Sequence, residues 1–159
     1  MSKAAAPPSA LDQALRWLAV RDRTEGELRL KLKRKSYPAD QIAAALERLR
    51  GLGYLDDARF ARGRAEALLS RGRLGPRGVE SRLLAAGLDR ELISTAVRNA
   101  MATRDELSLA RAALARRHPE APGTPDRKLR SKAVRFLLGR GFSSDVVSRA
   151  LGVDVDGGD

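Results

Sequence analysis

The chain of 159 residues contains no cysteine, a single histidine, and only six aromatic side chains, three Phe, two Tyr and one Trp. The lack of cysteine excludes disulfides, thiolate zinc sites and a cysteine nucleophile. His118 precedes a proline-rich turn and has no cluster of carboxylates near it in the sequence. A lone histidine of this kind is a poor metal ligand or general base, so we expect it to be solvated. The sequence therefore predicts no enzyme, no metal and no cofactor.

Long apolar runs are also missing. Pro7 and Pro8 stand where a signal peptide would carry its apolar segment, and no other stretch is apolar enough to span a bilayer. We therefore expect a cytoplasmic protein with no membrane contact, whose core is built from Leu, Ala, Val and Ile.

Basic residues are in clear excess, with 31 Lys and Arg against 20 Asp and Glu, a net charge of +11. Residues 58–103 hold 9 bases and 4 acids and residues 104–152 hold 11 and 5, whereas residues 11–57 hold 10 and 8. Such an excess is typical of proteins that bind a polyanion or an acidic protein surface, although soluble basic helices without a partner also carry it.

Apolar residues recur at intervals of three and four, the helical period, and no stretch alternates with the period of a strand. The helical segments also repeat. Taking Ile42, Ile93 and Val147 as equivalent, the leucines ten positions earlier are Leu32, Leu83 and Leu137. Six positions before the same anchors, Ser36, Gly87 and Gly141 suit a left-handed turn that ends one helix before the next begins.

The repeat predicts an all-α fold of three tandem three-helix units, each resembling a helix-turn-helix, in an elongated, curved arrangement. We expect a flexible N-terminus at residues 1–10, repeats at residues 11–57, 58–103 and 104–152, and a flexible acidic tail at residues 153–159. Within the third repeat, three prolines at 119–126 lengthen a turn.

Two adjacent carboxylates, Asp56 and Asp57, could suggest a catalytic or metal-binding pair. Neighbouring helical residues point about 100° apart, so the two do not converge on one ion. They precede a helical pattern, and we predict that they cap its free amides. Similarly, Thr24 and Glu27 predict a reciprocal capping box.

Three basic clusters are candidate contacts for nucleic acid or another polyanion. They are the end of the second helical segment, a glycine-rich loop that matches no phosphate-binding motif, and a helix in the third repeat. With few Asn or Gln side chains and no aromatic array, we expect DNA binding to be weak and non-specific, on single or double strands. The residues are Lys31, Lys33, Arg34 and Lys35; Arg71, Arg73 and Arg77; and Arg127, Lys128, Arg130, Lys132 and Arg135.

Three segments resemble the signatures of the RecX regulatory proteins: "RDRTEGELRLKL" at 21–32, "GYLDDARFA" at 53–61 and "LLGRGFSSDVVSRAL" at 137–151. The resemblance runs from about Leu11 to Gly152, with Ser36 where the family commonly has glycine. It implies a bacterial, non-enzymatic protein of DNA repair, recombination and the SOS response, and we expect the protein to be a monomer. Such proteins bind in the groove of the RecA filament on DNA and usually restrain its growth, strand exchange, ATP hydrolysis and coprotease function.

Two other readings remain open at the level of sequence. One is a basic helix-turn-helix transcription regulator that acts on DNA alone, and it would prefer its operator over random duplex by about 10³-fold or more. The other is an adaptor for an unrelated acidic protein.

Overall fold

The computed structural model describes residues 6–153, and within that range the chain forms nine α-helices and no strand. The helices are α1 (Ala10–Leu18), α2 (Glu25–Arg34), α3 (Ala39–Gly51), α4 (Asp57–Ser70), α5 (Pro76–Ala85), α6 (Arg90–Met101), α7 (Glu106–Arg117), α8 (Arg127–Gly139) and α9 (Ser144–Leu151). In the described residues no helix is long and apolar enough to cross a membrane.

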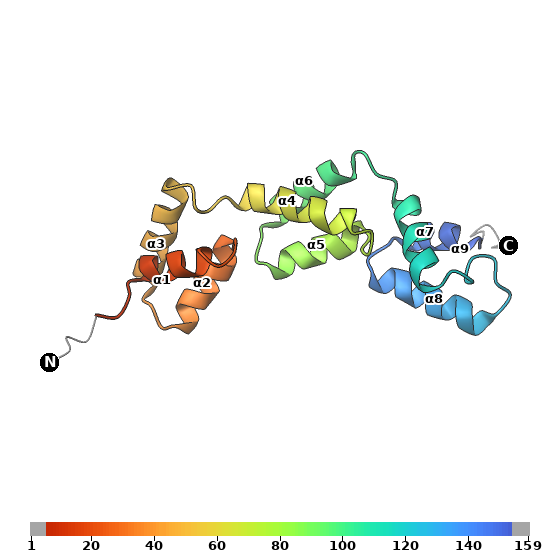
Figure 1. Ribbon diagram of the computed structural model, residues 1–159, viewed down its shortest axis with the longest axis horizontal. Coiled ribbons are helices and arrows are strands. Elements are labelled where there is room, and N and C mark those ends of the chain that lie inside the picture. Colours follow the sequence, from red (N-terminus) through yellow and green to blue (C-terminus); the bar gives the residue numbers. More distant parts are fainter. Residues whose placement is uncertain (1–5, 154–159) are drawn as a thin grey trace.

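The helices form three successive groups of three, which lie side by side along one long axis (Figure 1). We call α1–α3 module one, α4–α6 module two and α7–α9 module three. Each module has its own cluster of buried apolar side chains, and Leu109 packs against the clusters of both modules two and three. The predicted all-α architecture of three three-helix units is confirmed.

Equivalent positions of the repeat have equivalent environments. Leu32, Leu83 and Leu137 lie on the middle helices α2, α5 and α8, and all three are fully buried. The turns that follow these helices have positive φ angles of 63° at Ser36, 79° at Gly87 and 82° at Gly141. The predicted left-handed turn is therefore present in all three modules, and it directs each middle helix into the third helix of its module.

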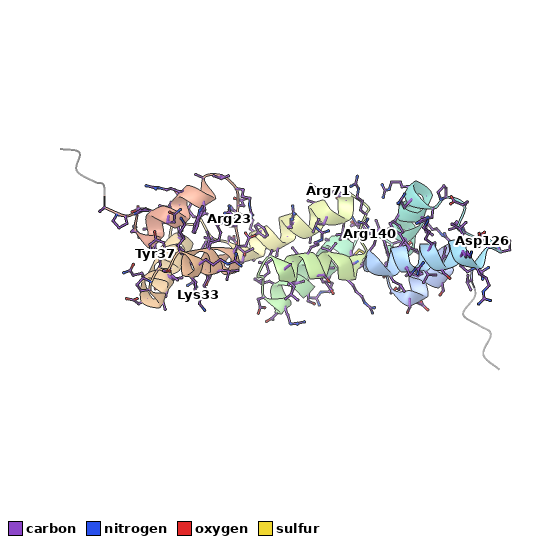
Figure 2. All side chains as sticks on the ribbon, turned by 90° about the horizontal axis from the view of Figure 1, so that it is seen from below. Arg23, Lys33, Tyr37, Arg71, Asp126 and Arg140 are labelled. Atoms are coloured by element: carbon purple, nitrogen blue, oxygen red, sulfur yellow. The ribbon has the colours of Figure 1, made fainter. Side chains whose placement is uncertain are left out.

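Consecutive modules are joined at the ends of their middle helices. The Thr24 hydroxyl, at the N-terminus of α2, donates to the carbonyl of Ala86, which follows α5. At the next junction the N–H of Gly75, which precedes α5, donates to the carbonyl of Arg140 after α8 at 2.9 Å. The positive end of one helix dipole thus meets the negative end of the next. The middle helices therefore follow one another head to tail, in the order α8, α5 and α2, from one end of the molecule to the other (Figures 1 and 2).

The helix caps agree only in part with the sequence prediction. Thr24 accepts from the N–H of Glu27 at 3.1 Å, but the Glu27 carboxylate does not reach back to close a capping box. Instead it pairs with Arg21 at 3.2 Å, because an opposite charge lies within its reach. The reciprocal box occurs in α1, between Ser9 and Asp12. Most of the expected flexible ends, 1–10 and 153–159, lies outside the described residues.

Candidate nucleic-acid and partner interface

The first predicted cluster lies at the C-terminal end of α2. Lys33, Arg34 and Lys35 are exposed, whereas Lys31 is half-buried. The Lys31 ammonium lies 4.8 Å from the centroid of the Trp17 ring, so a cation–π contact holds it within module one. All four cations also lie at the negative end of the α2 dipole. Lys33, Arg34 and Lys35 are therefore the members of this cluster that face solvent.

The second cluster lies at the junction between modules two and three. Arg71 and Arg73 belong to the loop after α4, Arg77 lies in the first turn of α5, and all three are exposed. The loop is fixed from module three, because the Arg116 guanidinium donates to the carbonyl of Gly72. Figure 2 labels Arg71 and Arg140 on the adjoining ends of these two modules. The three arginines thus project from a well-anchored segment.

The third cluster lies on α8 and divides into two parts. Arg127, Lys128, Lys132 and Arg135 line a shallow groove of about 410 Å³ along one face of the helix. Arg130 points elsewhere: it is half-buried and donates to the Thr124 carbonyl at 2.7 Å. The structure therefore brings four of the five predicted residues together and ties the fifth to the preceding loop.

The three clusters do not converge on one site. Figure 2 labels Lys33 in module one and Asp126, which precedes α8, near the opposite end of the molecule. The cluster at Arg71, Arg73 and Arg77 lies between them, at the junction of modules two and three. Any single ligand that touched all three clusters would have to run the length of the protein.

A further groove, between modules one and two, was missed by the sequence analysis. It encloses about 870 Å³, more than the groove of about 410 Å³ along α8. Its walls come from the α1–α2 loop, the start of α2, the α3–α4 loop, α4, and the C-terminal end of α5 with the residue that follows it. The lining includes five arginines, two aromatic side chains and three carboxylates: Arg21, Arg23, Arg59, Arg64, Arg82, Tyr54, Phe60, Asp22, Glu27 and Asp56. These residues are scattered from 21 to 82, so no local motif reveals them.

The two adjacent aspartates cap two different helices. Asp56 accepts from the N–H of Arg59 at 2.8 Å and caps its own helix α4, as predicted. Asp57 instead accepts from the N–H of Glu25 at 3.0 Å, and so it caps α2 in the neighbouring module. Burial raises the pKa of the Asp57 carboxyl above its ordinary value, although the hydrogen bond from Glu25 acts in the opposite direction. The pair therefore links modules one and two.

The expectation for His118 is wrong, because its side chain is buried. It is 8% exposed and stands edge-on to Phe136, with ring centroids 5.3 Å apart. Over residues 6–153, no three His, Asp or Glu side chains are grouped as a metal site would require. His118 is thus part of the core of module three.

Each of the three modules matches a family model of a known three-helix domain. The model of the first three-helix domain of RecX matches residues 10–49, that of the second matches 56–97, and that of the third matches 104–151. The three matches occur in the same order as the three modules of the structure.

Comparisons over most of the chain, with curated sequences and with solved structures, agree with the matches of the single modules. The chain is 35% identical to the regulatory protein RecX of Chlorobaculum tepidum over 143 residues, which is 90% of this chain and 86% of the relative. It is 36% identical to the regulatory protein RecX of Chromohalobacter salexigens over 88% of this chain and 89% of the relative. Among solved structures, a crystal structure of regulatory protein RecX superposes with a TM-score of 0.74 at 26% identity, covering 89% of this chain and 70% of that one. The structure of RecX from Lactobacillus salivarius, at 21% identity, has a TM-score of 0.73 and covers 90% and 92% of the two chains.

Proposed function

Because this chain belongs to the RecX family of regulatory proteins, we propose that it binds RecA filaments on DNA and inhibits their ATPase, recombinase and coprotease activities. The observation that carries the proposal is the ordered match of all three modules to the three family domains. The names of the relatives support a regulatory role, and the choice of RecA as the partner comes from the family resemblance.

The arrangement of the modules supports binding to a repeating partner. The three modules present separate exposed basic clusters at fixed positions along one axis. A filament presents the same protomer surface again and again. Several weak contacts to successive protomers combine through a high effective concentration, so tight binding does not require a deep pocket. A protein that bridges protomers in this way would restrain the changes that growth and ATP hydrolysis require.

We also propose a weak, non-specific contact with DNA phosphates through the exposed members of the predicted clusters. These are Lys33, Arg34 and Lys35 on α2, Arg71, Arg73 and Arg77 at the second junction, and Arg127, Lys128, Lys132 and Arg135 on α8. Arginine and lysine contacts to phosphate release counterions, so this binding weakens steeply with salt.

The remaining parts of the proposal follow from the regulatory role. The relatives carry the name of a regulatory protein, and we propose that this chain likewise acts without catalysis or a cofactor, as a cytoplasmic monomer. We propose residues 11–57, 58–103 and 104–152 as its three repeats.

A sequence-specific transcription regulator is the weaker alternative. Reading adenine edges in the major groove is commonly done by Asn or Gln. This chain has one Asn and two Gln, Asn99, Gln13 and Gln41, which belong to three different helices. A preference of about 10³-fold for one duplex over random duplex would favour that alternative.

The test measures RecA ATP hydrolysis on single-stranded DNA, together with filament length by electron microscopy, while this protein is added in increasing amounts. We expect both to fall at concentrations well below that of RecA. If both stay unchanged at equimolar ratio, the proposal is wrong.

A further inference from the structure

We infer that the groove between modules one and two binds a short segment of single-stranded nucleic acid, whose phosphates bridge the two modules and one of whose bases stacks on Tyr54. The inference builds on the DNA contact in the proposed function but names a site outside the three basic clusters. Its test uses this protein without RecA, so the two proposals can fail separately.

The groove exists because two small residues form part of its wall. The capping residues Asp56 and Asp105 are equivalent and lie 49 residues apart, so Gly63 corresponds to Ala112 and Ala67 to Arg116. At the second junction the Arg116 guanidinium crosses to the Gly72 carbonyl and ties the two modules together. At the first junction Ala67 has no side chain that could do this, and a β-carbon on Gly63 would meet nothing within 4 Å. The first junction is therefore left open where the second is bridged.

An arginine also replaces a core leucine beside this groove. Thr24 and Gly75 both precede a middle helix, so Arg23 is equivalent to Leu74, which is buried in the core of module two. The Arg23 Nε is buried and has no hydrogen-bond partner, and the structure gives its guanidinium no ion pair among residues 6–153. A buried Nε without a hydrogen-bond partner, at a position suited to leucine, is costly for folding alone. An anionic ligand in the groove would supply the missing charge partner.

Most of the positive charge in the groove is free to act on a ligand. Of the three carboxylates in the lining, Glu27 pairs with Arg21 and Asp56 caps the first turn of α4, which leaves Asp22 against the other four arginines. Arg59 and Arg64 on α4 and Arg82 on α5 have no ion-pair partner within the described part of the chain. Together with Arg23 from module one, they place guanidinium groups on both sides of the junction. Guanidinium groups bind phosphate oxygens in a bidentate manner, so one strand could tie the modules together.

The aromatic side chains favour a single strand over other polyanions. Tyr54 is 57% exposed, and Phe60, which belongs to the same lining, is half-buried. An exposed aromatic ring between arginines suits a splayed-out base, since every base has a π-face. An acidic peptide would use the arginines but leave the Tyr54 ring without a partner, and a duplex would keep its bases stacked inside.

The experiment measures the fluorescence anisotropy of a labelled short oligothymidylate with the full-length protein at low salt. The main variant is Ala67→Leu, which fills the groove without changing the charge. Its matched control is Ala115→Leu, at an exposed alanine of α7 outside the groove. Tyr54→Ala and Tyr54→Phe test stacking, and an abasic oligomer of the same length tests whether the base matters. Circular dichroism shows whether each variant keeps its helices.

We expect Ala67→Leu to weaken binding about tenfold while Ala115→Leu binds like the parent. Tyr54→Ala should weaken binding by about fivefold or more, and Tyr54→Phe should not. The abasic oligomer should bind Tyr54→Ala and the parent equally. The inference is overturned if Ala67→Leu binds as well as Ala115→Leu. It is also overturned if polyglutamate or duplex DNA displaces the oligothymidylate as effectively as unlabelled oligothymidylate does.

Discussion

A β-carbon on Gly26 would stand 2.7 Å from the carbonyl oxygen of Gly87. Gly26 lies in the first turn of α2, and Gly87 lies in the left-handed turn after α5. Modules one and two therefore meet backbone to backbone at the ends of their middle helices, with no side chain between them. The equivalent turn of module one has Ser36, which carries a β-carbon at φ 63°. Ser36 is exposed, so only its positive φ, and not a close neighbour, would favour glycine at this position.

This contact predicts opposite effects for two glycine substitutions. Gly26→Ala should destabilise the chain by about 1–3 kcal/mol, because the added methyl group forces the two backbones apart. Gly63→Ala should stabilise it by about 0.5–1 kcal/mol, because Gly63 lies within α4 with open space around it. Urea unfolding followed by circular dichroism measures both. A Gly26→Ala variant as stable as the parent would contradict the close backbone contact, and a destabilised Gly63→Ala variant would contradict the open space at Gly63.

The buried leucine of each middle helix provides a second prediction. Leu83 is fully buried, whereas its neighbour Leu84 is 45% exposed. Leu83→Ala should lower the free energy of unfolding by about 2–5 kcal/mol, because it leaves a cavity in module two. Leu84→Ala, the control, should change it by only about 0.5 kcal/mol. Thermal melts of the two variants check this, and equal melting temperatures would mean that the assignment of the core face of α5 is wrong.

The internal repeat made the fold predictable from sequence. Leu32, Leu83 and Leu137 occupy equivalent, buried positions in the three modules. Because each module requires an apolar residue at this position, the sequence carries a repeated apolar pattern. The turn after each middle helix was predictable for the same reason, since glycine is favoured at positive φ and occupies this position in modules two and three.

Contacts between modules were not predictable in this way. Asp57 looks like a cap for its own helix, and only the folded chain places its carboxylate on the N–H of Glu25, 32 residues away. The groove depends on Gly63 and Ala67, which look like ordinary helical residues in the sequence. Similarly, Glu27 was expected to close a capping box, but the carboxylate pairs with Arg21 from the preceding loop. Such contacts depend on how the elements pack, which local patterns do not encode.

The raised pKa of Asp57 gives a prediction that depends on pH. Above the pKa of Asp57 in the folded state, burial of the charged carboxylate lowers the free energy of unfolding of the parent. As the pH falls towards the ordinary carboxyl pKa, the carboxyl group is protonated and this loss of stability disappears. Asp57→Asn keeps an acceptor for Glu25 N–H without the charge. Its stability relative to the parent should therefore be greatest near neutral pH and should decline on acidification. Unfolding curves from pH 7 to pH 4 measure the difference, and Asp57→Ala, which lacks the acceptor, should be the least stable of the three chains at neutral pH.

The α8 cluster predicts which residues contribute to the salt dependence of DNA binding. Lys128 and Lys132 are exposed in the α8 groove, whereas Arg130 is held by Thr124. Removing one phosphate contact should reduce the slope of log K against log salt by about 1. We expect this for Lys128→Ala and Lys132→Ala but not for Arg130→Ala, which removes the same charge. A filter-binding titration with random duplex at several salt concentrations provides the measurement. A slope change for Arg130→Ala equal to the other two would mean that Arg130 leaves its loop to bind DNA.

The separation of the clusters predicts how inhibition of RecA should respond to combined substitutions. Neutralising Lys33, Arg34 and Lys35 at one end, or Arg127, Lys128 and Lys132 at the other, should raise the concentration required for half-inhibition of RecA ATP hydrolysis. Because the two sets lie in different modules and share no contacts, their free-energy effects should add, so the fold-changes should multiply. Neutralising Arg90 and Arg98, exposed arginines of α6 outside the clusters, is the control for loss of charge alone. If one set abolishes inhibition and the other has no effect, the protein binds the filament through one module rather than along its length.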